Sequence, residues 1–211
     1  MQTQILFQSP DFTIINKPSG LSCHNDDNSV EKEFSSKIHF VNRLDKETSG
    51  LLVITEKPEL QNELSLALKA GQKKYICILR GNLPPNTDWL SWNFPISDKA
   101  EGRQNPQGDL ASQVPAETLY RTLKSNSYFS LVECLLKTGR QHQIRKHSLL
   151  FGKPIIGDAR YGNEKDNQRI AKMYQFQRLA LHSYQLDFIW QNKDYHFACE
   201  IPEAFEYVFK H

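Results

Sequence analysis

The stretch HFVNRLDKETSGLLVITEK, residues 39–57, sets two opposite charges just before an apolar run. One residue separates Arg43 from Asp45, and four apolar residues follow at 51–54, directly after Gly50. Four consecutive apolar residues predict a short buried strand. Because burying an unpaired charge is costly, a base and an acid at the entrance to such a strand need a reason. One alternative is a plain turn, in which Asp and Ser bond the neighbouring backbone and Gly50 supplies special dihedral angles.

The size and composition of the chain are those of an ordinary globular protein. Of its 211 residues, 39% are hydrophobic and 24% are charged, which argues against disorder and allows a proper core. We expect one domain over residues 1–211, since neither a repeat nor a clear linker interrupts the sequence. No apolar stretch approaches the roughly 18 residues of a membrane span. The four cysteines occur singly, without zinc or redox spacing, and no secretory signal is visible, so we expect a reduced, cytoplasmic protein.

The net charge of +2 does not by itself indicate a nucleic-acid partner, but the charges are unevenly distributed. Between Glu133 and Asp158 there is no acidic residue, and there are five cations: Lys137, Arg140, Arg145, Lys146 and Lys153. A positive segment of this kind suits an anionic ligand. A solvated helix face explains the same pattern equally well.

The apolar patterning predicts more strands than helices. Strands are expected at residues 5–7, 12–15, 51–55, 75–79, 117–123, 129–136, 179–188 and 195–199. Helices are expected near 30–37, over 58–70 with a stop at Gly71, after Gly139 as far as about 151, and over 202–209. Strands that follow each other closely in the sequence are predicted to form hairpins. We therefore expect an α+β fold with a mixed, mostly antiparallel central sheet flanked by helices and loops.

The segment TGRQHQIRKH, residues 138–147, is the second candidate for function. If Arg140 opens the helix, four residues share one face: His142, Arg145, Lys146 and Leu149. A cation at a helix N-terminus opposes the macrodipole, so this placement is more natural if Arg140 meets a phosphate or a carboxylate. The alternative is a basic surface helix.

Metal and nucleotide sites lack their sequence patterns. His142 and His147 are five residues apart and point to different helix faces, and there is no His-Glu-x-x-His motif. Neither a Gly-Lys-Ser/Thr phosphate loop nor Gly-x-Gly-x-x-Gly occurs. We expect no metal and no nucleotide cofactor.

Taken together, the two stretches resemble the RluA-type family of RNA pseudouridine synthases, which isomerise uridine in ribosomal or transfer RNA. Five segments match in order: Asn16-Lys17-Pro18-x-Gly20-Leu21; Arg43-Leu44-Asp45-x-x-Thr48-Ser49-Gly50-Leu51; Lys74-Tyr75; Thr138-Gly139-Arg140-x-His142-Gln143-Ile144-Arg145-x-His147 with Pro154–Asp158 and Tyr161-Gly162; and Leu179–His182. The family usually has His where this chain has Asn42, so no role of that His is carried over. The chain starts directly on the first catalytic-domain strand, and we expect a stand-alone catalytic domain without the N-terminal RNA-binding domain of longer relatives.

The resemblance implies the catalytic residues. Asp45 is the implied carboxylate beside the sugar, with three roles open to it: attack on C1′, addition to the base, or deprotonation of the sugar. Arg145 is implied to reach Asp45 and keep it ionised, as an opposite charge within about 4–6 Å does. Tyr75 and Ile144 are implied to sandwich the uracil, and the Tyr75 hydroxyl is a candidate proton carrier.

The resemblance also implies the RNA contacts. Arg43 is implied to enter the place vacated by the flipped base, where its planar guanidinium stacks on bases and bonds phosphates. Arg140, Lys146 and Lys17 are expected phosphate contacts. The implied substrate is structured RNA, tRNA or rRNA, with a lean towards tRNA from the Lys-Thr-Gly-Arg motif and residues 176–179. An isomerisation needs no cofactor, and we expect a monomer without a membrane or an obligate protein partner.

Two rival functions remain at this point. Asn42 prompts the first, a catalytically lost RNA-binding module of the same fold, although the presence of Asp45, Tyr75 and Arg145 argues against it. The second is a glycoside hydrolase, which also places carboxylates at C1′ but generally needs a second one as proton donor. No second acidic motif stands out in the sequence.

Overall fold

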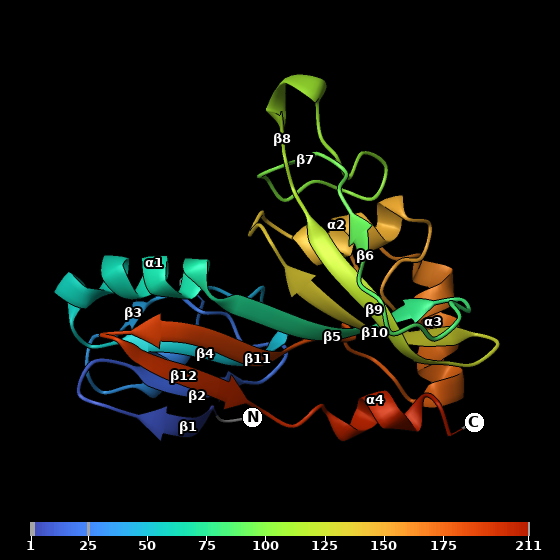
Figure 1. The fold of residues 1–211 in the computed structure, drawn as a ribbon. Coiled ribbons are helices and arrows are strands. Elements are labelled where there is room, and N and C mark those ends of the chain that lie inside the picture. The colour runs from blue at the N-terminus through green and yellow to red at the C-terminus, as the bar shows by residue number, and fades with distance from the viewer. Residues whose placement is uncertain (1–2, 25, 211) are drawn as a thin grey trace. The chain divides into compact units, whose positions relative to one another are not determined.

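The computed structural model describes residues 3–24 and 26–210, and its elements are drawn in Figure 1. The chain forms two compact units. The first comprises Met1–Lys74 and His182–Glu200, and the second comprises Tyr75–Leu181 and Ile201–His211. The single catalytic domain expected over the whole chain stays a prediction.

The first unit is built on a mixed sheet. Its strands are β1 (Gln4–Gln8), β2 (Thr13–Lys17), β3 (His39–Phe40), β4 (Ser49–Thr55), β11 (Leu181–Trp190) and β12 (Lys193–Ala198). Antiparallel pairs join β1 to β2, β2 to β4, β3 to β4 and β11 to β12, whereas β4 and β11 run parallel. The strand expected from the apolar run is confirmed as β4, which is buried at all seven positions because it lies between β2 and β11.

The helix expected over residues 58–70 is confirmed as α1 (Gln61–Ala70), preceded by one 3-10 turn. Leu64 and Leu68 lie one turn apart and pack into the core with apolar residues of β2, β4 and β11. Gly71 ends the helix without a left-handed φ. It is required for a close approach instead, since a Cβ there would lie 2.0 Å from a backbone oxygen of β11.

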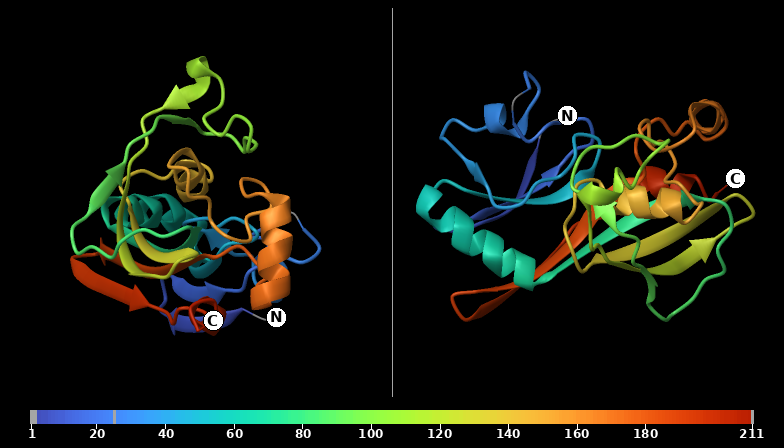
Figure 2. Two further views of the ribbon diagram at one scale, coloured as in Figure 1. Left: turned by 90° about the vertical axis from the view of Figure 1, so that its right-hand side faces the viewer. Right: turned by 90° about the horizontal axis from the view of Figure 1, so that it is seen from above.

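The second unit has a sheet of strand order β5-β10-β9-β6 and a separate two-stranded ribbon, β7 with β8. The strands are β5 (Gln72–Arg80), β6 (Leu90–Trp92), β7 (Ile96–Ser97), β8 (Gln113–Val114), β9 (Thr118–Ser125) and β10 (Phe129–Leu136). The expected hairpin is confirmed, because β9 and β10 pair antiparallel around a short turn. In Figures 1 and 2 the β7–β8 ribbon stands away from the β9–β10 hairpin.

Helix α2 (Gln143–Leu150) carries the second motif but begins later than expected. His142 precedes it in a left-handed conformation with φ of 56°, so Arg140 lies outside the helix and the face proposed to contain His142 does not form. Residues 143–148 are all buried. The basic surface helix is therefore also wrong, because these polar side chains have partners inside the protein.

The remaining helical segments are short or flank the sheets. They are η1 (Val30–Glu33) and η2 (Pro58–Leu60) in the first unit, and η3 (Leu110–Ser112), α3 (Glu164–Tyr174) and α4 (Glu203–Tyr207) in the second. Among the residues that the structure describes, no helix combines the length and hydropathy needed to cross a membrane.

His147 shows how α2 buries a polar ring. Its Nδ1 lies 3.0 Å from the hydroxyl of Thr118, and its Nε2 lies 3.0 Å from the backbone oxygen of Phe94. A neutral imidazole satisfies both contacts, donating to the carbonyl and accepting from the hydroxyl. Burial lowers the pKa of His147 to about 4, so the ring stays neutral where an exposed histidine is half protonated.

Acidification should destabilise the fold through this ring. Between pH 6.5 and pH 4 the unfolded chain binds a proton at His147 that the folded chain does not bind, so stability falls as the pH falls. From pH 7 to pH 5 we expect His147 to remove about 2 kcal/mol from the free energy of unfolding. Urea titrations of the wild type and His147→Gln at both pH values measure this, because Gln keeps a donor for Phe94 but does not titrate. Equal pH dependence in the two proteins would contradict the assignment.

Candidate active site

Asp45 lies in a short turn between β3 and β4, which we call the Asp45 turn (residues 43–48). The backbone carbonyl of Asp45 accepts a hydrogen bond from the N–H of Thr48 at 3.0 Å, directly before β4 begins. Leu44 is buried, whereas Arg43 on one side is exposed and Asp45 on the other is partly buried. The chain thus anchors this turn by its apolar residue and leaves both charges in contact with solvent.

Lys17, at the end of β2, holds the Asp45 turn from inside. Its side chain is fully buried, and its Nζ donates to the carbonyls of Pro18 at 3.0 Å, Leu21 at 2.7 Å and Lys46 at 3.1 Å. These bonds use all three N–H donors of the ammonium. The expected phosphate contact by Lys17 is therefore corrected: this lysine ties the loop after β2 to the residue next to Asp45.

The same loop binds the Asp45 turn twice more. The N–H of Gly20 donates to the carbonyl of Lys46 at 2.8 Å, and the hydroxyl of Ser19 donates to the carbonyl of Glu47 at 2.5 Å. The Asn-Lys-Pro-x-Gly segment and the Arg-Leu-Asp segment, which the sequence shows as separate motifs, form one hydrogen-bonded structure in the first unit.

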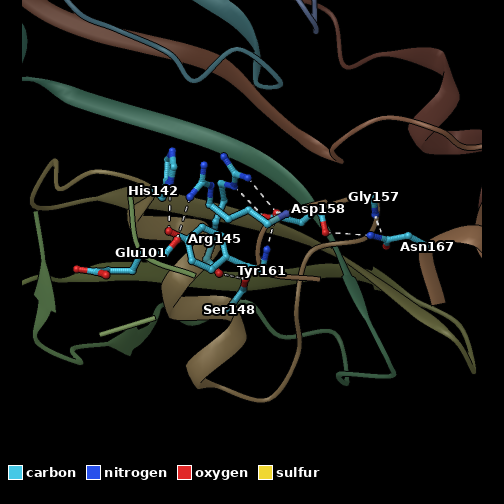
Figure 3. A network of polar contacts seen from close by, with 9 residues as sticks. Glu101, His142, Arg145, Ser148, Gly157, Asp158, Tyr161 and Asn167 are labelled. Carbon is cyan, nitrogen blue, oxygen red and sulfur yellow. Dashed lines mark hydrogen bonds and ion pairs between the residues drawn. The ribbon is translucent and has the colours of Figure 1, made fainter. Parts of the chain in front are cut away.

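In the second unit, Arg145 of α2 forms a two-point ion pair with Asp158, as Figure 3 shows. Nε of Arg145 lies 2.8 Å from Oδ2, and Nη2 lies 2.9 Å from Oδ1. Both side chains are almost fully buried, with exposed fractions of 4% and 1%. The backbone N–H groups of Arg160 and Tyr161 also donate to Oδ1, each at 2.9 Å. The carboxylate thus accepts hydrogen bonds at both oxygens and fixes the plane of the guanidinium.

Tyr161 supports the same guanidinium from another direction. Its ring centroid lies 5.3 Å from Cζ of Arg145, within the range of a cation–π contact. Its hydroxyl lies 3.0 Å from Nδ1 of His142, the residue with the left-handed backbone before α2 (Figure 3). The helix start and the turn that carries Asp158 are thereby joined around Arg145.

Lys146 and Arg140 attach the α2 region to the end of β7 and to the residues that follow it. Nζ of Lys146 donates to the backbone carbonyls of Ser97 at 2.8 Å and Lys99 at 2.7 Å, and the side chain is fully buried. The expectation that Lys146 contacts phosphate is corrected for this reason. Arg140 is half-buried, with Nη1 lying 3.8 Å from a carboxylate oxygen of Asp98. A phosphate contact by Arg140 stays a prediction.

The structure groups the expected site residues by unit. Arg43, Asp45 and Lys17 lie in the first, and the other five lie in the second: Tyr75, Arg140, Ile144, Arg145 and Lys146. Tyr75 on β5 and Ile144 on α2 are both buried. The convergence of Asp45 with Arg145 and Tyr75 stays a prediction from the sequence. Within the described part of the chain, no group of three or more His, Cys, Asp or Glu side chains is placed to hold a metal ion.

Sequence reasoning gave no role to Asp158, Tyr161 or His142, although all three lie around Arg145. The signal was present in the spacing Gly-Asp-x-x-Tyr-Gly at residues 157–162, which follows α2 closely. A buried arginine on a helix requires a carboxylate nearby, and Asp158 is the first acidic residue after it.

Comparison with known proteins shows the family. Residues 11–149 match the family model described as RNA pseudouridylate synthase, which is more than half of the chain. The chain belongs to the RNA pseudouridylate synthase family. The matched residues include the Asp45 turn, Tyr75 and Arg145, and the resemblance expected from the sequence is confirmed.

Individual members of the RNA pseudouridylate synthase family are also similar to this chain in sequence. A protein of Buchnera aphidicola named ribosomal large subunit pseudouridine synthase C is 33% identical over 196 residues, covering 88% of this chain and 62% of its own length. This chain therefore spans less than two thirds of that relative. A Pasteurella multocida protein named tRNA pseudouridine synthase C is 30% identical over 211 residues, covering 89% of this chain and 86% of its own.

The fold is found in solved structures of the family as well. The structure titled human RNA pseudouridylate synthase domain containing 4 has a TM-score of 0.78 and 22% identity, covering 98% of this chain and 92% of that one. Together with the helices and the mixed sheet of the first unit, this confirms the expected α+β class.

Replacing Lys17 should loosen the Asp45 turn. Lys17→Met removes a fully buried ammonium from the three carbonyls it binds, and we expect the free energy of unfolding to fall by about 3 kcal/mol. Lys46→Met is the control, since that side chain is half exposed and pairs with Asp26 at the surface. Urea unfolding of both variants checks this, and equal small effects would show that Lys17 does not hold the turn.

Removing the buried charge of Asp158 should lower the free energy of unfolding more than removing the charge of a more exposed aspartate. Asp158→Asn takes the buried carboxylate from Arg145, and we expect a loss of about 3 kcal/mol in the free energy of unfolding. The matched control is Asp166→Asn, whose partner Arg80 is half exposed, with an expected loss under about 1 kcal/mol. Chemical denaturation of both variants measures the two losses. An equal loss of stability in Asp166→Asn and Asp158→Asn would contradict a special contribution from the Arg145–Asp158 pair.

Proposed function

We propose that this protein converts uridine to pseudouridine in structured RNA. The observation that carries the proposal is the family match over residues 11–149, which spans both motifs built around Asp45 and Arg145. The relatives described above are named as ribosomal RNA and tRNA pseudouridine synthases, which supports RNA of one of these classes as the substrate. The proposal includes a cytoplasmic monomer that acts as one catalytic domain without an obligate protein partner.

The reaction exchanges one bond for another in the same nucleotide. The C1′–N1 glycosidic bond breaks, the uracil rotates, and a C1′–C5 bond forms. C5 then gives up its hydrogen as a proton, and N1 gains one, so the product has the composition of the substrate. Neither an oxidant nor an energy donor enters this balance. The protein has to stabilise a changing charge at the sugar and move two protons.

Asp45, Arg145 and Tyr75 are the proposed catalytic residues, acting on the same uridine. The carboxylate of Asp45 is the group for C1′ or the base, and its place in a tightly bonded turn supports this role. Arg145 is proposed to keep that carboxylate ionised. Its two-point pair with Asp158 uses two of the five N–H donors of the guanidinium and sets the plane of the others. The Tyr75 hydroxyl is the proposed proton carrier.

Three further residues are proposed to bind the RNA. Arg43 is exposed on the Asp45 turn, where a planar cation can replace a flipped base in the stack. Ile144 is proposed to pack against the uracil from the opposite side to Tyr75. Arg140 is half-buried before α2 and is proposed to contact a phosphate. Lys17 and Lys146 are no longer part of this set, because their ammonium groups bind the backbone of the chain itself.

Release of tritium from RNA labelled at uracil C5 tests the proposal, because C5 loses its hydrogen only when the new bond forms. We expect the wild type to release tritium from tRNA or rRNA and Asp45→Asn to release none above background. RNA binding that weakens with salt, without tritium release by the wild type, would favour the rival RNA-binding module. Free uracil among the products would favour a glycoside hydrolase instead.

Asp45→Asn removes one charge without changing the size of the side chain, so its fold can be compared directly with the wild type by thermal unfolding. Equal tritium release by Asp45→Asn and the wild type would contradict the assignment of Asp45 while leaving the reaction itself in place.

A further inference from the structure

Three polar side chains, two buried and one partly buried, form a chain of contacts at the start of β4. The hydroxyl of Ser49 lies 2.7 Å from Nδ1 of His182, and Nε2 of the same ring lies 3.2 Å from the sulfur of Cys199. Ser49 and His182 have exposed fractions of 3% and 1%. All three residues belong to the first unit: Ser49 lies on β4, His182 lies on β11, and Cys199 directly follows β12.

The backbone is locked at the same place. Ser49 and His182 face each other in the parallel ladder of β4 and β11, and Gly50 faces Ser183. A Cβ on Gly50 would lie 2.1 Å from the carbonyl oxygen of Ser183, so the two strands approach more closely than any other residue allows. The first residues of β4 therefore have one position relative to β11.

A serine, a histidine and a cysteine linked by contacts resemble a nucleophilic triad. Their burial argues against such a role, because Ser49 and His182 are not accessible to solvent. Burial also raises the pKa of the Cys199 thiol to about 12, so the sulfur is protonated and a poor nucleophile at neutral pH. A neutral imidazole, with one N–H and one acceptor nitrogen, serves both neighbours in either tautomer. The contacts among these three side chains are therefore suited to fixing the position of β4 relative to β11.

We propose that His182 is a positioning residue for Asp45, acting through the hydroxyl of Ser49. This inference rests on the function proposed above, in which Asp45 is the catalytic carboxylate. Ser49 is the residue at which the Asp45 turn enters the sheet, and the turn is closed one residue earlier by the bond from Thr48 to the carbonyl of Asp45. Fixing Ser49 thus fixes the end of the turn that the loop after β2 does not reach.

The size of the effect follows from the precision that catalysis needs. A displacement of about 1 Å from the productive geometry can cost on the order of 100-fold in rate. Loss of the Ser49 contact should therefore lower kcat. It should leave KM for the RNA unchanged, since neither Ser49 nor His182 reaches the surface where RNA binds.

Two substitutions of His182 distinguish a role in positioning Ser49 from a purely structural role in filling the core. The amide of Asn lies where Nδ1 of the ring lies, so His182→Asn keeps a partner for Ser49 and loses the contact with Cys199. The amide of Gln reaches the place of Nε2, so His182→Gln keeps Cys199 and loses Ser49. Each variant gives up one buried contact, which makes them matched controls for stability.

Tritium release under single-turnover and steady-state conditions measures the result. We expect His182→Asn to retain kcat within about threefold and His182→Gln to lose about 10- to 100-fold, with KM unchanged in both. Equal losses in the two variants, or losses in KM alone, would overturn the inference. An inactive wild type would instead count against the proposed function, so the two failures are distinguishable.

Ser49→Ala provides the same test with a smaller change, because it removes one oxygen atom and keeps His182. It should match His182→Gln in kcat. A Ser49→Ala protein with wild-type kcat overturns the inference whether or not the His182 variants fold.

Discussion

An ionised side chain that leaves water has to be given partners inside the protein, at a cost of several kcal/mol per ion if they are missing. Both units of this chain are organised around that constraint. In the first, Lys17 bonds three backbone carbonyls, one of them next to Asp45. In the second, Arg145 and Asp158 bind each other, and Lys146 bonds the carbonyls of Ser97 at the end of β7 and of Lys99. The charged residues of the motifs therefore build the scaffold of the candidate site as well as its chemistry.

Much of the fold could be predicted because its signals are local. The apolar run became β4, the 3.6-residue spacing after Pro58 became α1, and Ser-Asn-Ser between two β-like runs became the turn of the β9–β10 hairpin. The start of α2 could not be predicted, because His142 has a left-handed backbone and its ring contacts Tyr161, which lies 19 residues away in the sequence. Helix α3 received no expectation, although Asn163 caps it through the N–H of Asp166. Short strands such as β6 and β7 lack a pattern of their own and depend on their neighbours.

Some features of the candidate site could likewise be predicted from the sequence, and others could not. Asp45, Arg43 and Arg145 were found from residue types and the family resemblance, because their order along the chain is distinctive. The burial of Lys17 and Lys146 was not visible, since their partners are backbone carbonyls, which any sequence supplies. The role of Asp158 could not be predicted, because the sequence does not show which guanidinium lies beside this carboxylate.

The central proposal is that Asp45 and Arg145, which lie 100 positions apart in the sequence, act together on one uridine. A double-mutant cycle of single-turnover rates with Asp45→Glu and Arg145→Lys tests it most directly, since both variants keep the sign of their charge. If the two residues act together, the double variant should be at least about tenfold faster than the product of the two single effects predicts. A rate equal to that product would mean that the residues act independently, and it would contradict this account.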